Sequence, residues 1–386
     1  MREDGQRSTP TWEGSEQIYV MGSDLVGRYI AFLLAGTETI PPIRYLIHRM
    51  NLWNAWENCG RQLQIQRITG VEKRNRVKAE FMSMKASPPL PGPLIPNLII
   101  TVPPGSVVGA LAPIKHRLDH RSTICLVHHG LGAMEAIIEA HFPDQRTRPA
   151  FLLGHMTAKV RQFKGHFSAT EVEDGRLYLT IPTTRGGSIM RKHPPPERTV
   201  RFTNLMSLLM TIPELNASSH PFPDFLKHKL PSLALLSIAE PLAAICEVPY
   251  EDLLRHDTTR HLMAIMLSEV CAVVSKMPEC RREGSPLSFL SVFLQKKFYK
   301  ELHNQKKSQP RLDMNIYRAW ETDINYLTGY FIHRAEELNI RVPILKAVLQ
   351  LLKAKRHFAA EDLERVIPFE EPSVQLLDDL APGQQS

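Results

Sequence analysis

The first half of the chain alternates short apolar runs with segments that have helical spacing. Residues 18–21 (IYVM) form an apolar run that ends at Gly22, and Asp24–Leu34 places its apolar residues at helical intervals. A second apolar run, Ile43–His48, follows. Strand, helix and strand within so short a span form a βαβ unit, which joins parallel strands. The chain is therefore expected to fold around a parallel sheet covered by helices.

The same alternation continues to about residue 181. Val107–Leu118 and Gly132–Ala140 have helical spacing, and Asp174-Gly175 is expected to close a β-hairpin between the last two strands. The pattern predicts a doubly wound α/β domain of the Rossmann type. Further strands are expected at Leu63–Ile68, Leu98–Val102, Thr123–Val127, Ala150–Leu153, Ser168–Val172 and Arg176–Ile181.

Past a basic, proline-rich segment, RKHPPPERTVR, no strand pattern remains. We predict a Rossmann-type domain at residues 18–190, a linker at 191–202 and an all-helical domain at 203–369. Residues 1–17 and 370–386 are expected to be tails. Helices of the second domain are expected at Asn204–Met210, Phe225–Ile245, Thr258–Lys276, Ser288–Leu302, Ile316–Leu338 and Pro343–Lys355.

Charge, cysteine content and hydropathy narrow the function classes. The formal net charge of +7 suits an anionic cofactor, a nucleic acid or no particular partner. Five cysteines without a C-x-x-C pair disfavour a disulfide framework and a zinc site, so a reducing compartment is expected, cytoplasmic or mitochondrial. No run of 18 apolar residues occurs, and the polar start lacks the apolar core of a secretory signal, so no membrane span is expected.

The turn after the first strand reads GSDLVG from Gly22 to Gly27. Dinucleotide-binding turns carry G-x-G-x-x-G here, and their second glycine lets the pyrophosphate approach the backbone. Asp24 replaces that second glycine and adds a negative charge. An aspartate and a phosphate are favoured at a helix N-terminus for the same electrostatic reason. The turn is either a modified cofactor site or one that binds no dinucleotide, with Asp24 in the place of the phosphate.

The end of the second strand carries Arg49. Enzymes that use NADP place a basic residue here for the 2′-phosphate, whereas enzymes that use NAD place an acid. Arg49 therefore suits NADPH, and Lys73 and Arg74 are expected nearby. The alternative is that Arg49 is an ordinary solvated surface residue.

Three histidines are expected near the ends of neighbouring strands: His128, His129 and His155. Open α/β sheets bind ligands at such strand ends. No cysteine or carboxylate accompanies these histidines at the spacing of a metal site, so no bound metal is expected.

The basic excess is concentrated between residues 291 and 311, where six cations accompany one acid, Glu301. Phe298 and Tyr299 are interleaved with them. Clustered cations and aromatic rings favour RNA or another anionic partner, because phosphates need cations and bases need stacking partners. The alternative is a solvated helix face with Phe298 and Leu302 directed into the core. The cations are Lys296, Lys297, Lys300, Lys306, Lys307 and Arg311.

Five segments between residues 18 and 355 carry a family resemblance: IYVMGSDLVGRYIAFLLAG, RYLIHR, ICLVHHGLG, LKHKLPSLALLSIAEPLAAI and TDINYLTGYFIHRAEELNIRVP. The third is similar to a Q-N-G-x-G strand end and the fourth to a helix K-L-x-x-N-x-x-x-N-P-L-T-A. The last is similar to T-E-I-D-Y-I-N-G-Y-x-x-x-x-G-x-E-L-G-I-x-x-P. These are motifs of the ketopantoate reductase (2-dehydropantoate 2-reductase) family, and the chain resembles its fungal members.

The resemblance implies a Rossmann-type domain followed by a helical domain like the C-terminal domain of 6-phosphogluconate dehydrogenase, with the active site between them. Family members transfer hydride from NADPH to the keto group of 2-dehydropantoate, giving pantoate, and a helix lysine donates the proton. That lysine position falls at Ser232, and a serine hydroxyl is a poor acid. Lys229, one turn earlier, would reach the cleft only if the helix register shifted.

The resemblance places the remaining substrate contacts at positions whose chemistry has changed. The asparagine of Q-N-G is His129, and the two helix asparagines are Leu236 and Glu240. Leucine offers no hydrogen bond, and a glutamate would repel a carboxylate substrate. The glutamate of T-E-I-D is shortened to Asp323, which keeps a candidate catalytic carboxylate, and the asparagine of I-N-G is Thr328.

Two functions remain. The first is an NADP-dependent reductase of a small 2-keto acid, with its activity lost or altered in this chain. The second is a non-catalytic binding or scaffold protein, associated with RNA or another anionic partner in a mitochondrial assembly. A homodimer is compatible with both, and tight NADPH binding would favour the first.

Overall fold

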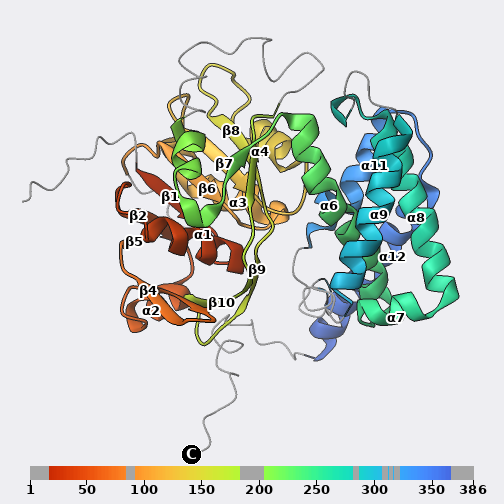
Figure 1. Ribbon diagram of the computed structural model, residues 1–386, viewed down its shortest axis with the longest axis horizontal. Helices are drawn as coiled ribbons and strands as arrows, with labels where there is room; N and C mark the ends of the chain where they lie inside the picture. Colours follow the sequence, from red (N-terminus) through yellow and green to blue (C-terminus); the bar gives the residue numbers. More distant parts are fainter. Residues whose placement is uncertain are drawn as a thin grey trace, which may run out of the picture.

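The computed structural model describes residues 17–83, 92–182, 204–280, 287–306 and 322–366, together with Leu312 and Ile316. Figure 1 shows a sheet-containing domain and a helical domain, with helix α6 lying between them. The predicted linker and C-terminal tail lie outside the described residues, as does the predicted N-terminal tail apart from Gln17.

The first domain is built on an eight-stranded sheet. Neighbouring strands are parallel except for the antiparallel pair β8 and β11. The Rossmann-type prediction is confirmed by this arrangement, in which β1 lies beside β2 and β6. In spatial order the strands are β12 (Ser218–Ser219), β11 (Leu177–Thr180), β8 (Ala150–Met156), β7 (Thr123–Val127), β6 (Asn97–Ile100), β1 (Ile18–Met21), β2 (Ile43–Ile47) and β5 (Val77–Phe81).

Helices cover both faces of this sheet because its strands are apolar on both sides. Ile18 and Val20 of β1 pack in one core with α1 (Leu25–Ala35) and α2 (Met50–Asn58). Tyr19 and Met21 pack in the other core with α3 (Val107–Leu111) and α4 (Ala133–His141). That second core continues into the helical domain, so the two domains share buried apolar surface.

One predicted helix is shorter than expected. The segment predicted as Val107–Leu118 is α-helical only to Leu111, and Ala112–Arg117 continues as the 3₁₀ turn η3. Pro113 lies in the first turn of η3 and has no N–H for a helical hydrogen bond, which explains the change.

The predicted hairpin at Asp174-Gly175 is wrong. β10 (Ser168–Glu173) lies in a separate four-stranded sheet, whereas the following strand β11 pairs with β8 in the main sheet. Leu177 and Leu179 of β11 are almost fully buried in the main sheet, where a wide apolar surface covers them. Burial of these two leucines therefore decided the pairing over the local turn. The small sheet has the order β4 (Gly70–Arg74), β3 (Leu63–Arg67), β10, β9 (Lys159–Gln162).

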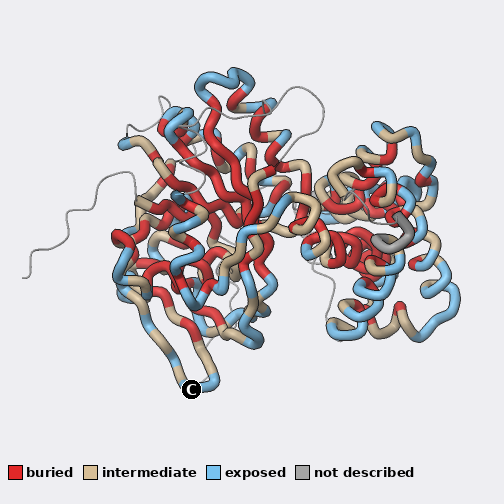
Figure 2. Tube along the Cα trace, turned by 45° about the horizontal axis from the view of Figure 1, so that its top comes forward, coloured by how far each residue is buried: buried red, intermediate tan, exposed pale blue. Residues whose placement is uncertain are grey.

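The helical domain surrounds a central helix, α6 (Phe222–Cys246), which packs against each of its other long helices. Figure 2 shows the interior of this domain as buried. The predicted helix at Ile316–Leu338 is interrupted: the described part is a 3₁₀ turn, η6 (Asp323–Tyr326), followed by α11. The remaining helices are α7 (Tyr250–Arg255), α8 (Asp257–Lys276), α9 (Leu287–Asn304), α11 (Thr328–Glu337) and α12 (Pro343–Val366).

Residues 204–219 belong to the packing of the first domain rather than the second, contrary to the predicted boundary. The helix at residues 204–210 buries Leu205 and Leu209 in the core that contains α1. β12 then adds a strand to the main sheet beside β11, where no strand was predicted. A two-residue strand carries no apolar periodicity, so the sequence could not reveal it.

Helix α6 has the length and hydropathy of a membrane span, and 83% of its most apolar window is buried inside the protein. No other helix in the described part of the chain has both properties.

Candidate functional site

The Gly-rich turn begins where β1 ends, and its two glycines lie against Thr101. Gly22 has φ +134°, and a Cβ there would collide with Thr101 Oγ1 and lie 2.9 Å from Val102 N. A Cβ on Gly27 would collide with Gly22 O and with Thr101 Oγ1. Both positions therefore require glycine, and the turn keeps the tight packing of a dinucleotide-binding turn.

Asp24 caps the N-terminus of α1 with its own carboxylate. This carboxylate accepts hydrogen bonds from the Gly27 backbone N–H, at 3.3 Å, and from the Thr101 hydroxyl. Desolvation raises the pKa of Asp24, although both hydrogen bonds act in the opposite direction. The helix end at which a dinucleotide-binding turn holds the pyrophosphate therefore holds the Asp24 carboxylate in this chain.

Of the three predicted cations for a 2′-phosphate, only Arg49 lies at the expected place. Arg49 is exposed directly after β2. The guanidinium of Arg74 pairs with Glu72 at 3.1 Å and lies close to Gly36, at the opposite end of α1 from the turn. Lys73 is on β4 in the small sheet. The prediction that Lys73 and Arg74 lie near this site is therefore wrong, because β3 and β4 belong to the small four-stranded sheet and not to the main sheet.

Ser232, at the family's lysine position, contacts α9. Its hydroxyl lies 3.3 Å from Glu301 Oε2. Desolvation raises the pKa of Glu301, and the Ser232 hydroxyl opposes that shift. Ser232 thus serves packing between α6 and α9.

Lys229 lies at the interface of the two domains without any shift of the helix register. Its side chain is buried, and its Nζ donates a hydrogen bond of 2.6 Å to His128 O, at the end of β7. Lys229 was expected to reach the cleft only if the helix register shifted, and it contacts the end of β7 without such a shift. α6 begins beside the sheet domain, so a residue one turn nearer its start meets β7, whereas Ser232 meets α9.

The other predicted substrate contacts are engaged inside the protein. Glu240 accepts hydrogen bonds from Leu312 N, at 2.9 Å, and from the Tyr250 hydroxyl. The Thr328 hydroxyl donates to Ser237 O at 2.8 Å. The structure therefore uses these two side chains to hold the helical domain together.

Asp323 and His129 lie where the two domains meet. Asp323 Oδ1 accepts a hydrogen bond of 3.1 Å from Gly105 N, so η6 is tied directly to the loop after β6. His129 is half-buried after β7, next to Gly130, whose Cα lies so close to Tyr326 that a Cβ would be 2.8 Å from Tyr326 Cβ. The loops that would border a nicotinamide and its substrate are thus in contact with each other.

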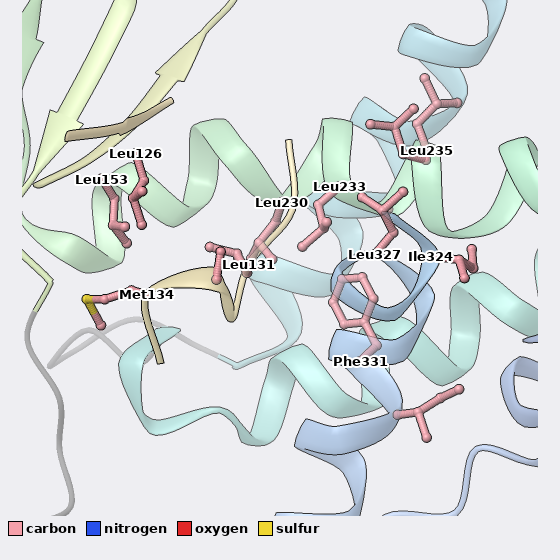
Figure 3. Close-up of a cluster of buried hydrophobic side chains, with 14 of the residues drawn as sticks. Leu126, Leu131, Met134, Leu153, Leu230, Leu233, Leu235, Ile324, Leu327 and Phe331 are labelled. Carbon is pink, nitrogen blue, oxygen red and sulfur yellow. The ribbon is translucent and has the colours of Figure 1, made fainter. Parts of the chain in front are cut away.

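A cavity of about 360 Å³ opens at the domain interface beside Lys229. α4, α6 and α11 and the end of β7 form it, and none of the nine site residues predicted from the sequence lines it. Figure 3 shows apolar side chains of both domains in this region, including Leu126, Leu131 and Leu230. Lining residues include Leu126, His128, Leu131, Met134, Glu135, Glu139, Leu153, Phe222, Lys229, Glu279, Tyr330, His333, Arg334 and Glu337.

Burial changes the acidity of two groups in this cavity. It lowers the pKa of Lys229 to about 7. It also lowers the pKa of His128 to about 3, and the nearby Lys229 ammonium adds to that shift. Both ring nitrogens of His128 are out of contact with solvent. Sequence reasoning missed this cavity, although His128 and Lys229 were both noticed, because it depends on which side chains meet across two domains.

The described histidines do not form a metal site. Among the residues that the structure describes, no three His, Cys, Asp or Glu side chains are grouped closely enough to hold a metal ion. His155 instead faces the ring of Tyr178, which also lies near His228, at a centroid distance of 3.9 Å, and near His220, at 5.4 Å.

The basic segment lies mostly on α9, which separates its charged and apolar residues. Lys296, Lys297 and Lys300 are exposed, whereas Phe298 and Leu302 are completely buried. The predicted inward direction of Phe298 and Leu302 is confirmed, and Tyr299 remains 41% exposed beside the lysines. Lys306 is half-buried, and Lys307 and Arg311 lie outside the described residues.

Comparison with known proteins covers both domains. Residues 18–180 match the family model described as ketopantoate reductase PanE/ApbA, and residues 224–356 match the model of its C-terminal domain. A probable 2-dehydropantoate 2-reductase of Schizosaccharomyces pombe is 22% identical over 349 residues, which are 88% of this chain and 96% of that protein.

Two solved structures share the fold. D-mandelate dehydrogenase with NADH and anilino(oxo)acetate has a TM-score of 0.64 and 13% identity, over 89% of this chain and 99% of its own. A dimeric ketopantoate reductase from Staphylococcus aureus has a TM-score of 0.62 and 12% identity, over the same shares of both chains. The resemblance noted in the sequence is confirmed: this chain belongs to the ketopantoate reductase family.

Proposed function

We propose that this chain has lost the NADPH-dependent reduction of 2-dehydropantoate to pantoate and acts as a binding protein on the family's scaffold. The observation that carries the proposal is the Asp24 carboxylate at the N-terminus of α1, bonded to the Gly27 amide and the Thr101 hydroxyl. A dinucleotide needs this helix end and a close approach of its pyrophosphate. Asp24 opposes both, because it occupies the helix end and, when ionised, repels phosphate.

The positions of the proton donor and the substrate contacts support the same proposal. Ser232 faces Glu301 and supplies no acid, and a positioned general acid contributes about 10²–10⁴-fold to the rate of such reactions. Leu236 offers no hydrogen bond, and the carboxylate of Glu240 is held by Leu312 N and the Tyr250 hydroxyl. A carboxylate substrate would thus meet no charged donor at these positions.

Calorimetric titration with NADPH tests the proposal. We expect no binding at millimolar NADPH and no loss of NADPH absorbance when 2-dehydropantoate is added. A catalytically active family member measured in parallel shows that the reagents are sound. Tight NADPH binding that Arg49→Ala abolishes would overturn the proposal and favour the competing function, a reductase with an altered 2-keto acid substrate.

A second candidate function is association with an anionic partner such as RNA, and the exposed face of α9 favours it. Lys296, Lys297 and Lys300 lie there with the partly exposed ring of Tyr299, an arrangement that suits phosphates and stacked bases. Cytoplasmic or mitochondrial location and homodimer formation belong to this proposal as expectations.

Fluorescence anisotropy with a labelled single-stranded RNA tests this candidate. We expect binding that weakens as salt rises and that is lost when Lys296, Lys297 and Lys300 are all replaced by glutamine. Lys353→Gln on α12, also exposed, is the matched control. Binding that neither salt nor the triple variant reduces would exclude α9 as the contact surface.

A further inference from the structure

Lys229 has an unusual environment for a lysine. Its side chain is 2% exposed, and its Nζ lies 5.8 Å from the centre of the Phe225 ring. The acceptor that the described residues offer to Nζ is the His128 carbonyl, and none of their carboxylates lies within ion-pair distance of it. An ammonium buried in this way has lost water without gaining a negative partner, which favours the neutral amine.

The cavity gives this amine access to a small molecule. Its volume of about 360 Å³ is at the lower end of the range of about 300–1,000 Å³ that ligand pockets have. Leu126, Leu153 and Met134 form buried walls near the sheet domain, and Glu135, Glu139 and Glu337 are exposed at its rim. A molecule can therefore enter past the rim and meet Lys229 at an apolar inner end.

The charges of the rim select against anions. Among the described residues, four glutamates and one arginine line the cavity, and that arginine, Arg334, pairs with two of the glutamates, Glu279 at 2.6 Å and Glu337. A carboxylate ligand would therefore meet repulsion without a free guanidinium to balance it. An uncharged ligand, or one with a cationic group toward the rim, would not. This preference is opposite to that of a site for 2-keto acids.

We propose that this cavity binds a small uncharged or cationic aldehyde and holds it covalently as an imine of Lys229. The Lys229 nitrogen attacks the carbonyl carbon, and the carbonyl electron pair moves to oxygen. The nitrogen loses a proton and the oxygen gains one, which gives a carbinolamine. Loss of water then forms the C=N bond, and no oxidant or reductant is required.

This inference is independent of the proposed loss of reductase activity. The cavity contains neither the Gly22–Gly27 turn nor Asp323, Ser232 or Glu240. If the protein binds no NADPH, the proposal for Lys229 still stands. If Lys229 forms no imine, the proposal that the turn no longer binds a dinucleotide still stands.

Reductive trapping tests the proposal on the full-length protein. The protein is incubated at pH 7 with propanal and cyanoborohydride, which reduces an imine to a stable secondary amine. Tandem mass spectrometry then compares Lys229 with Lys227, a partly exposed lysine two residues away on the same helix. At pH 7 about half of a lysine with a pKa of 7 is neutral, roughly 10³ times the fraction of an ordinary lysine. We expect labelling of Lys229 to exceed that of Lys227 by at least about tenfold, because restricted access offsets part of this advantage.

Three compact aldehydes of different charge test the selectivity. Propanal is neutral, betaine aldehyde is cationic and glyoxylate is anionic. We expect propanal and betaine aldehyde to label Lys229 faster than glyoxylate, and replacement of Glu135 and Glu337 by glutamine to reduce that difference. Faster labelling by glyoxylate would overturn the predicted charge preference.

The pH dependence and two variants complete the test. Labelling of Lys229 should rise with a midpoint near pH 7, and Lys229→Arg should abolish it, whereas Lys227→Arg should not. Labelling of Lys229 no faster than that of Lys227 in the unmodified protein would sink the proposal, and this comparison needs no variant to fold. The described titratable groups that face the amine or line its cavity are His128, His155, Glu135, Glu139, Glu279, Tyr330, His333, Arg334 and Glu337.

Discussion

The Gly-rich turn and the Lys229 cavity lie at the ends of strands β1 and β7 of one sheet. They differ in whether their buried polar groups are paired within the protein. At the turn, Asp24 binds the Gly27 amide, and the Tyr45 hydroxyl donates to Gly22 O at 2.5 Å. At the cavity, Lys229 donates to the His128 carbonyl, and none of the described carboxylates lies within ion-pair distance of it.

At the turn the polar groups pair with each other, whereas at the cavity the Lys229 amine borders an open volume. Buried polar groups are normally satisfied, and at the turn they satisfy one another within the protein. A buried amine without a charged partner, such as Lys229, can gain stabilisation from a ligand that binds beside it. Family membership alone points to a ligand at the turn. The proposal made above adds a second ligand site beside Lys229.

The largest expected effect concerns the charge of Lys229. Its pKa is about 7 in the folded chain, against an ordinary value of 10.5. Between these values the unfolded chain binds a proton that the folded chain does not, so this lysine makes stability rise with pH and costs stability below pH 7. Relative to Lys229→Met, the wild-type free energy of unfolding should therefore increase by roughly 3 kcal/mol from pH 7 to about pH 9.5.

Chemical denaturation at several pH values measures this difference. Lys227→Met is the matched control, since that lysine pairs with Asp224 at 2.7 Å on the partly exposed side of the same helix, and it should follow the wild-type profile. Parallel pH profiles for wild type and Lys229→Met would show that Lys229 keeps its proton and that the cavity is not apolar in the way described.

The second prediction compares one glycine from each site. Gly27→Ala places a Cβ against Gly22 O and Thr101 Oγ1, and we expect a loss of about 2–3 kcal/mol from overpacking. Gly132→Ala at the cavity meets nothing nearer than 3.8 Å, so only its φ of +95° is penalised, by about 1 kcal/mol. Urea denaturation of both variants should show this order, and equal losses would mean that the turn is less tightly packed than described.

The fold was more predictable than the sites because it depends on periodic burial. Alternating apolar runs located β1, β2 and β7, since strands covered on both faces must be apolar throughout. The pairing of β11 with β8 could not be predicted from the sequence. Leu177 and Leu179 would suit a hairpin with β10 equally well, and only the complete main sheet favours β8.

Position along a helix explains what was missed at α6. Ser232 and Lys229 differ by three residues, or about 4.5 Å along the axis. This small distance separates contact with Glu301 of α9 from contact with His128 of β7, because α6 runs from the edge of the sheet domain into the bundle. The sequence identifies the helix but not the point at which its neighbours change.

The third prediction concerns removal of the Asp24 carboxylate from the Gly-rich turn. Asp24→Gly restores the second glycine of the fingerprint and removes the carboxylate from the end of α1. We expect a loss of about 1 kcal/mol from the missing cap and from the Thr101 hydroxyl left without its acceptor. We also expect NADPH binding to appear in calorimetry.

Asp24→Asn is the control for this change, because it removes the charge and keeps the side chain in place. It should bind no NADPH if the filled helix end is the obstacle. Binding by Asp24→Asn would show instead that charge repulsion alone excludes the dinucleotide.

The smallest expected effect concerns a lysine restored at the family's proton-donor position, residue 232. Ser232→Lys places an ammonium beside Glu301, on the α9 side of α6, so it should form an ion pair there and change stability by less than about 1 kcal/mol. Combined with Asp24→Gly, it should add no NADPH oxidation in the presence of 2-dehydropantoate, because an ammonium paired with Glu301 is not free to donate a proton to a substrate. Detectable oxidation in the double variant, absent from Asp24→Gly alone, would show that the ancestral cleft survives at Ser232 and that the closed turn is the one obstacle to reduction.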